Sequence, residues 1–362
     1  TDSRCACQPA SGARVDGPSP ITVNGLLDWG AGAGFTGPGV VNIHGQMVVG
    51  PGGGQKSLYD RTINNAGLTT MNGRFEMLGS AAFNNLPSGV FDILIDGIII
   101  GSGSTTPFNN AGRVVKSFGV GISTIRAPFN NTGTVEVRTG TLQFGYAFVQ
   151  TAGETILNGG NVATVSSPAP RLNGGRLRGN GSIGDGLNNV GGIVEPGLSA
   201  GGMTVTGAYT QAPGGTLHIE IAGLTPITEH DQLIVSGAAT LDGTLEVEFL
   251  DGFVPSAGDQ MEFLVAASRT GYFDRIVSPL PAGVKYSATT AALIVLNSWA
   301  DLDLDCDVDL RDHALFQQCF GGAGAGLPTR CLPLIDADLD NDGDADLEDY
   351  RGVFQPAITG PG

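Results

Sequence analysis

The sequence predicts a mainly β protein, a β-solenoid that leads into a C-terminal β region and then into a small α-helical module. Three observations predict it. Glycine makes up 58 of the 362 residues, about twice its usual share, while hydrophobic residues still reach 41%. Short Val, Ile, Leu and Thr runs of alternating polarity lie between the glycines, as at 134–137 and 245–249. Near the C-terminus, an acidic twelve-residue pattern occurs twice.

An internal repeat organises the strands. An apolar residue followed by Asn-Asn, and soon by glycine, recurs with spacings of 20, 25, 21 and 58 residues. A period of 20 to 25 residues is typical of a β-solenoid, in which each coil buries its apolar face by stacking on its neighbours. We expect the apolar residues of the repeat to stack as an internal ladder. They are Ile63, Phe83, Phe108, Phe129 and Leu187.

The asparagines of this repeat predict a second ladder. Asparagine tolerates a left-handed backbone, which suits a turn, and its side-chain amide can bond an asparagine one rung along. We therefore expect the first asparagine of each copy to occupy an equivalent turn position. These residues are Asn64, Asn84, Asn109, Asn130 and Asn188.

The pattern divides the chain into four parts. Residues 1–20 form an N-terminal arm, in which Pro18 and Pro20 favour an extended backbone. Residues 21–205 form the solenoid with its Asn/Gly repeats. Longer strands at 206–297 predict a C-terminal β region that caps or continues the solenoid. Residues 298–362 hold the acidic module and a tail.

The two acidic segments match the ligand spacing of a calcium-binding loop. Oxygen ligands at positions 1, 3, 5, 9 and 12, with a backbone carbonyl at position 7, can surround this hard cation at about 2.3–2.6 Å. Each loop is therefore predicted to bind one calcium ion. The side-chain ligands of the first loop are Asp301, Asp303, Asp305, Asp309 and Asp312, with the carbonyl of Asp307. Those of the second loop are Asp338, Asp340, Asp342, Asp346 and Asp349, with the carbonyl of Asp344.

The surroundings of the loops predict that metal binding and folding depend on each other. The aliphatic residues at position 8, Val308 and Ala345, are expected to face inward, and each loop runs into a short helical segment. Without a cation, the six carboxylates of the first loop and the seven of the second repel one another. The module should therefore need the metal to fold. The alternative is an acidic, solvated tail.

The pair of loops resembles the duplicated calcium-binding segments of type I dockerin domains, over roughly residues 300–356. The resemblance implies calcium binding, and docking onto a cohesin partner through loop positions 10 and 11 and the helix that follows. Here those positions hold Leu310-Arg311 and Leu347-Glu348 instead of the small hydroxyl residues often found there. Gly352 and Pro356 are expected to end the second helix early.

The β-rich part has a resemblance of its own. Its Asn/Gly repeats and the longer strands after them, such as 203–211 and 231–237, resemble the C-terminal end of autotransporter passenger domains and related secreted bacterial solenoids. The resemblance covers roughly residues 60–296. It implies a right-handed parallel β-helix displayed outside the cell, often with an adhesive or structural role.

Charge and hydropathy narrow the choice of partners and location. The formal charge is −17, but residues 301–349 hold 14 of the 35 acids, leaving 21 acids against 16 basic residues elsewhere. With no basic patch, nucleic acid is not an expected partner. No apolar run approaches the roughly 18 residues of a membrane span, so no transmembrane segment is expected. The start at Thr1 fits a processed, secreted protein of the extracellular space or cell surface.

The cysteines lie only near the two ends of the chain. Cys319 and Cys331 flank a Gly-rich linker and are predicted to form a disulfide, which fits an oxidising compartment. Cys5, Cys7 and Cys306 remain, and an odd count suggests an intermolecular bridge or a free thiol. Cys306 also takes position 6 of the first loop, where glycine is usual, which predicts backbone strain.

These cysteines suggest head-to-tail assembly. The segment 13–24 is long enough to cross to a neighbouring subunit, pair there and bring Cys5 or Cys7 to Cys306. Such a contact propagates as a filament instead of closing into a ring. The alternative is that the arm folds back on its own chain, or that Cys5 and Cys7 stay reduced.

No catalytic constellation is evident. The four histidines are scattered, and no Gly-x-Ser-x-Gly motif or phosphate loop occurs. Two functions remain open. The first is a calcium-stabilised structural or adhesive protein, plausibly a self-assembling filament or surface-layer subunit that meets a cell-surface protein or polysaccharide. The second is a secreted carbohydrate-active or carbohydrate-binding protein anchored through the dockerin-like module.

Overall fold

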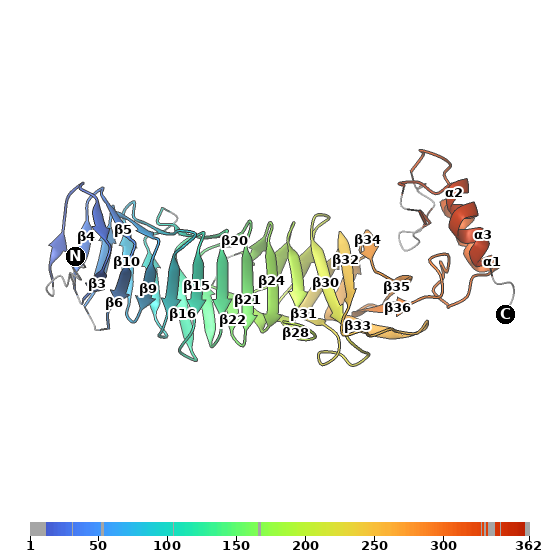
Figure 1. Cartoon of the computed structure of the whole chain (residues 1–362), viewed down its shortest axis with the longest axis horizontal. Coiled ribbons are helices and arrows are strands. Elements are labelled where there is room, and N and C mark those ends of the chain that lie inside the picture. The colour runs from blue at the N-terminus through green and yellow to red at the C-terminus, as the bar shows by residue number, and fades with distance from the viewer. Residues whose placement is uncertain are drawn as a thin grey trace.

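The computed structural model is a long rod of stacked β-strands with a helical module at its C-terminal end (Figure 1). It describes residues 12–30, 32–51, 54–103, 105–165, 168–326, 328, 331, 337–340 and 342–358. The strands pair in parallel from coil to coil. The chain is thus a mainly β protein built on a parallel β-solenoid, as the repeat predicts.

Each coil contributes one strand to each of three columns that run along the rod. The first column contains β1 (Arg14–Val15), β4 (Gly34–Thr36), β7 (Lys56–Tyr59), β10 (Phe75–Leu78), β13 (Ile98–Gly101), β16 (Ile122–Arg126), β19 (Thr141–Phe144), β22 (Asn161–Thr164), β25 (Ser182–Ile183) and β28 (Gly202–Val205). The second contains β2 (Ile21–Val23), β5 (Val40–Ile43), β8 (Thr62–Asn65), β11 (Ala82–Asn85), β14 (Phe108–Asn110), β17 (Phe129–Asn131), β20 (Phe148–Gln150), β23 (Arg171–Leu172), β26 (Leu187–Asn189) and β29 (Tyr209–Gln211). The third contains β3 (Leu26–Trp29), β6 (Gln46–Val49), β9 (Leu68–Met71), β12 (Val90–Ile93), β15 (Arg113–Lys116), β18 (Thr134–Val137), β21 (Glu154–Asn158), β24 (Arg176–Asn180), β27 (Ile193–Pro196), β30 (Thr216–Ile221), β32 (Thr244–Phe249) and β34 (Arg275–Val277).

Two long strands join the first two columns. β31 (Gln232–Leu241) and β33 (Gln260–Gly271) each run through both, so the two columns form one 24-stranded sheet, while the third column is a separate 12-stranded sheet. The coils thus continue well beyond residue 205. The 24-stranded sheet then ends in an antiparallel hairpin of β35 (Ala282–Tyr286) and β36 (Thr290–Val295) that pairs with β33.

The start of the rod differs from the expected free arm. Arg14–Val15 pairs with β4 and Ile21–Val23 pairs with β5 of the same chain. Val15, Ile21 and Val23 also pack against the main core. This segment therefore buries its apolar side chains within its own chain. The prediction that it crosses to a neighbouring subunit is therefore wrong for these strands. Cys5 and Cys7 lie outside the described residues.

An aromatic ladder fills part of the core, as expected from the repeat. The Phe83 and Phe108 rings stack with centroids 4.8 Å apart, and Phe108 and Phe129 follow at 5.3 Å. Phe129 and Phe148 continue the stack at 5.9 Å. In-register pairing of β11, β14, β17 and β20 aligns these residues. The repeat therefore places one bulky ring per coil at the same interior position.

The first asparagines of the repeat form a hydrogen-bonded ladder. From Asn42 to Asn130, each amide nitrogen donates to the amide oxygen of the preceding member, at 2.8 to 3.1 Å. The members are Asn42, Asn64, Asn84, Asn109 and Asn130. They lie within strands, and the expectation of left-handed turn positions is wrong, because none of them has a positive φ. Extended backbone aligns the amides more directly than a turn would.

Asn188 lies outside this hydrogen-bonded ladder. Following the register from Asn130, the column passes through Val149 and Arg171 before it reaches Asn188, and Thr210 follows. Asn188 thus occupies the equivalent strand position without an asparagine on either side. The repeat placed it in the right column, but nothing in the motif showed that Val149 would interrupt the amide chain.

The second asparagines form a ladder on the inner side, which the sequence analysis missed. Asn65, Asn85, Asn110 and Asn131 are buried, and each amide nitrogen donates to the oxygen of the next member at 2.8 to 3.0 Å, ending on Gln150. Asn65, Asn85 and Asn110 also donate to a backbone carbonyl in the coil ahead. The alternation of a strand predicts that adjacent asparagines face opposite sides. We did not expect the second asparagine to face inward, because the core was expected to be apolar.

The outer ladder gives a testable stability effect. We expect Asn109→Leu to lower the free energy of unfolding by roughly 1–3 kcal/mol, because it leaves the amides of Asn84 and Asn130 without their partner. Urea titration followed by circular dichroism measures the change. Asn188→Leu is the matched control, since it removes an asparagine from the same column outside the ladder. An equal loss in both variants would contradict a stabilising role of the amide chain.

Candidate metal-binding loops

The two acidic loops each lead into a helix through the same type of cap. The first helix is α1 (Leu310–Cys319), capped by Asp309. The second begins as α2 (Leu347–Asp349), capped by Asp346. In both, the aspartate at loop position 12 completes a capping box by accepting from the backbone of the cap residue. The aspartates at positions 9 and 12 of each loop thus cap the start of the helix as well as facing the loop.

The second helix is longer than expected. α2 passes into a π-helical segment, η1 (Tyr350–Phe354), and then into α3 (Gln355–Ala357). Gly352 and Pro356 therefore do not end it early. Gly352 lies inside the π-helical segment, and Pro356 lies in the first turn of α3, where its missing N–H is tolerated.

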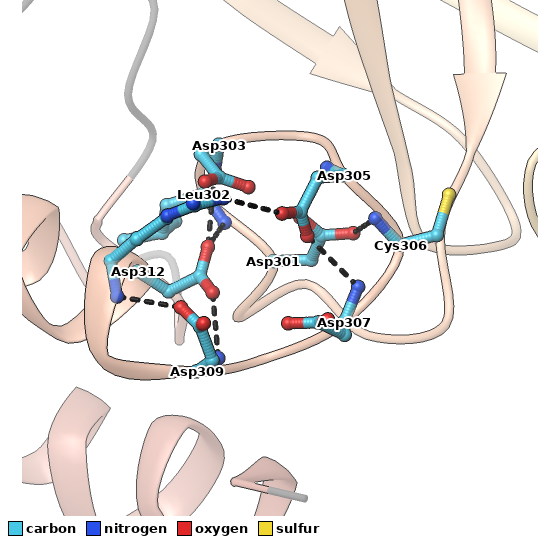
Figure 2. A network of polar contacts seen from close by, with 9 residues as sticks. Asp301, Leu302, Asp303, Asp305, Cys306, Asp307, Asp309 and Asp312 are labelled. Atoms are coloured by element: carbon cyan, nitrogen blue, oxygen red, sulfur yellow. Dashed lines mark hydrogen bonds and ion pairs between the residues drawn. The ribbon is translucent and has the colours of Figure 1, made fainter. Parts of the chain in front are cut away.

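The carboxylate at position 12 organises each loop from within. One oxygen of Asp312 accepts from the backbone nitrogens of Leu302 and Asp303 at 2.6 and 3.0 Å, and the other accepts from Asp309 at 2.8 Å (Figure 2). Asp349 makes the same three contacts, with Leu339, Asp340 and Asp346. Both aspartates are fully buried.

The carboxylate at position 1 fastens the middle of each loop. Asp301 accepts from the backbone nitrogens of Asp305 and Cys306 at 3.2 and 2.8 Å. Asp338 accepts from Asp342 and Gly343 at 3.0 and 2.9 Å. The two loops, 37 residues apart, therefore share one local structure contact by contact.

Among the residues that the structure describes, four groups of three carboxylates have ligand oxygens within 4.8 Å of one another. They are Asp301, Asp303 and Asp312; Asp307, Asp309 and Asp312; Asp338, Asp340 and Asp342; and Asp344, Asp346 and Asp349. Every aspartate proposed from the spacing takes part except Asp305, which instead lies 3.5 Å from the guanidinium of Arg311. Asp307 and Asp344 take part through their carboxylates, whereas the spacing assigned them only a backbone carbonyl.

Orphaned oxygens show that the donor set fits a hard cation. Oδ1 of Asp303, Asp307 and Asp344 is buried and has no hydrogen-bond partner within the described part of the chain. A buried carboxylate oxygen without a partner is costly. Since carboxylate oxygens are the ligands preferred by calcium and magnesium, a divalent ion would satisfy these atoms.

Burial and neighbouring carboxylates raise the pKa values of four loop aspartates. Burial raises the pKa of Asp301 to about 6, and the Asp312 carboxylate adds to the effect. The pKa values of Asp303, Asp307 and Asp340 are also raised, first by desolvation and then by neighbouring aspartates. A divalent ion should therefore compete with protonation of these four aspartates as the pH falls.

The module has a small core of its own. Val308 and Ala345, the residues at position 8, are buried in it, as expected, beside Phe316 and Phe354. A disulfide joins Cys319 to Cys331, as predicted from their spacing. Leu310 and Leu347, at position 10 of each loop, are instead 82% and 49% exposed.

A second group of titratable residues lies on the third column, in the last coils. His218 sits between two carboxylates, with Nδ1 3.7 Å from Glu195 and Nε2 3.6 Å from Glu248. Next to it, burial raises the pKa of Glu220. Outside the third column, just before β31, Asp231 is fully buried and accepts from the backbone nitrogens of Gly201 and Glu220 at 2.8 and 3.0 Å. The histidines are scattered along the sequence, and their spacing gave no indication of this cluster.

Asp231 makes the stability of the rod depend on pH. Burial raises its pKa to about 8, while an unfolded aspartate titrates near 3.9. Between these values the folded chain holds a proton that the unfolded chain lacks, so stability falls as pH rises from about 4 to 8. We expect thermal unfolding to show this fall, and Asp231→Asn to reduce its slope. The same slope in both proteins would contradict this assignment.

A polar groove of about 520 Å³ lies close to Asp231. Its lining combines amides, hydroxyls and small residues with one apolar side chain: Asn161, Asn180, Gly181, Ser182, Ala200, Gly201, Gly202, Thr204 and Ile227. Ile227 has a φ of 70°, which is unusual for a β-branched residue. Asn161 and Asn180 use their oxygens to hold Ser182 and Gly202.

No protein-family model matches the chain, and no curated protein matches it either. Within the part of the chain that the structure describes, no helix combines the length and apolar character needed to span a bilayer.

Proposed function

We propose that this protein is an extracellular, calcium-stabilised β-solenoid with a structural or adhesive role. The observation that carries the proposal is the equivalence of the two acidic loops, each of which gathers buried aspartates around carboxylate oxygens that lack a hydrogen-bond donor. The rod supplies length and a regular surface, while the loops supply a dependence on divalent cations that extracellular calcium would satisfy.

Calcium is favoured over magnesium by the number and kind of ligands. Each loop offers several aspartates along one flexible segment, and calcium accepts six to eight oxygens in irregular geometry. Magnesium demands near-ideal octahedral geometry and keeps several waters. The many protein oxygens of each loop therefore suit the larger ion.

Isothermal titration of the chelator-treated protein tests the metal. We expect about two calcium ions per chain, with much weaker binding of magnesium. Asp349→Asn should leave about one ion, since the first loop stays intact, whereas Glu348→Gln, at an exposed position outside the carboxylate groups, should leave two. A chain that binds no calcium, or whose melting temperature ignores chelator, would overturn the proposal.

Self-association head to tail remains part of the proposal, in an altered form. The outer edges of β3 and β34 end the 12-stranded sheet and have no strand partner among the described residues. Unpaired edges favour strand addition from another copy. Contact between β34 of one chain and β3 of the next would extend the sheet, and a bridge from Cys5 or Cys7 to Cys306 of the neighbour would make it covalent.

Negative-stain microscopy and sedimentation in calcium test this assembly. We expect filaments or rod multimers in the intact protein, and smaller species in a variant with Cys5, Cys7 and Cys306 changed to serine if the bridge forms. Non-reducing electrophoresis reports the bridge separately. Monodisperse single rods with three free thiols would remove self-assembly from the proposal and leave the calcium module untouched.

The exposed leucines favour a second candidate function. Leu310 and Leu347 occupy equivalent positions on the two halves of the module, and each presents an apolar side chain to solvent. This pair supports an anchoring role toward a partner protein, with the rod as a secreted carbohydrate-active or carbohydrate-binding part. Titration with soluble polysaccharides and an assay for released sugars test the rod. A Leu310→Asp, Leu347→Asp variant tests anchoring at a cell surface.

A further inference from the structure

The first acidic loop lies against the hairpin that ends the rod, and a glycine lies at the contact. Gly283 lies in β35, and a Cβ atom built there would come within 2.5 Å of the side chain of Leu304. A larger residue at this position would displace the Leu304 side chain from its present place. Leu304 stands at position 4 of the first loop. The hairpin therefore receives a loop side chain at a strand position that has none of its own.

A second contact involves position 6 of the same loop. The side-chain amide of Asn297, which directly follows the hairpin region, donates to the carbonyl of Cys306 at 2.7 Å. The Cys306 sulfur points away from the carboxylates in Figure 2. It lies 3.9 Å from the position that a Cβ on Gly258 would take. Gly258 itself bonds the backbone of Val295 in β36.

The same short segment therefore has two sides. Asp303 and Asp307 turn a carboxylate toward the other aspartates of the loop, whereas Leu304 and Cys306 meet the rod. Leu304 and Cys306 have positive φ angles of 61° and 77°, which residues other than glycine seldom adopt. The backbone conformation that gathers the carboxylates is thus also the one that presents Leu304 and Cys306 to the hairpin.

The second loop makes no such contact at position 6. Gly343 has a φ of 105°, and a Cβ there would meet nothing within 4 Å. Cys306 is therefore more than a departure from the usual glycine. It occupies the position through which the first loop touches the rod.

We propose that the first loop is a cation-dependent joint that fixes the helical module to the end of the rod. This proposal rests on cation binding by the loop. An ion held by Asp301, Asp303 and their neighbours selects the backbone conformation of residues 303–306, and that conformation seats Leu304 against Gly283. Without the ion, the loop relaxes and the module moves independently of the rod.

Hydrogen-exchange mass spectrometry of the full chain, with calcium and with chelator, tests the joint. In the wild type we expect calcium to slow exchange in both residues 301–307 and strand β35, the latter by about 5- to 150-fold, the usual range for coupling between two sites. In Leu304→Ala, calcium should still protect the loop but no longer β35. Leu310→Ala, at the exposed first residue of α1, should behave as the wild type.

The outcomes separate the joint from the cation site itself. Protection of 301–307 without any change in β35 in the wild type would overturn the joint and leave calcium binding standing. No change in either segment would overturn calcium binding by the first loop and the joint with it. If Leu304→Ala fails to fold, Asn297→Ala, which removes only the bond to the Cys306 carbonyl, provides the same comparison.

Discussion

Replacing Asp312 and Asp349 together by alanine is expected to unfold the helical module while the rod stays folded. Each carboxylate accepts three backbone hydrogen bonds and belongs to the carboxylate groups of its loop. Saturating calcium at a thousand times its dissociation constant stabilises a site by about 4 kcal/mol. The free energy lost with both calcium sites exceeds what the small separate core of the module can offset.

Limited trypsin digestion in calcium measures this effect. Arg311 and Arg351 lie in the helical segments of the module, so cleavage there reports unfolding. The wild type should resist cleavage until chelator is added, and the double variant should be cut with or without calcium. Glu348→Ala is the matched control on the same helix. A double variant that still resists trypsin would show that the module folds without its loops.

Asn110→Leu should destabilise the rod more than any substitution in the outer ladder, by about 3–5 kcal/mol. Asn110 is buried, donates to Asn131 and to the carbonyl of Thr134, and accepts from Asn85. Leucine removes all three bonds and leaves buried polar partners unsatisfied, at about 1–3 kcal/mol each. Asn109→Leu, which changes the neighbouring residue on the outer side, is the natural comparison, because water can replace the hydrogen bonds that are lost with Asn109.

Urea unfolding of the two variants gives the comparison directly. If Asn110→Leu is as stable as Asn109→Leu, the inner amides contribute little beyond filling space. The slope of the unfolding free energy against urea should be unchanged in both, since neither variant alters the surface exposed on unfolding. A changed slope in Asn110→Leu would indicate that the coils no longer unfold together.

The repeat allowed the solenoid and its interior phenylalanine column to be predicted, because a fixed period of apolar residues places one ring per coil. It could not show where the column of asparagines would be interrupted. Val149 and Arg171 occupy the same position with no related motif. The inner ladder escaped notice because a run of buried amides contradicts the usual polarity of a core, and it becomes stable only when every amide finds its neighbour.

The loops were more predictable than their surroundings. Ligand spacing located the carboxylates, since position along a short loop largely determines position in space. The spacing did not reveal the contact of Leu304 with Gly283, because the two residues meet only through the placement of the module on the hairpin. The cluster around His218 was hidden for a similar reason: its members come from three successive strands of the third column.

The two long strands that join the first and second columns have a mechanical consequence. A coil near the N-terminus is held by short separate strands and can peel away one rung at a time, as expected of a stack with nearest-neighbour contacts. β31 and β33 each run through both columns and pair in both, with one register shift between Val235 and Ala238, so the pairing in the two columns there must break together. A load applied through the helical module would enter the rod at its toughest end, and rupture would begin at the opposite one.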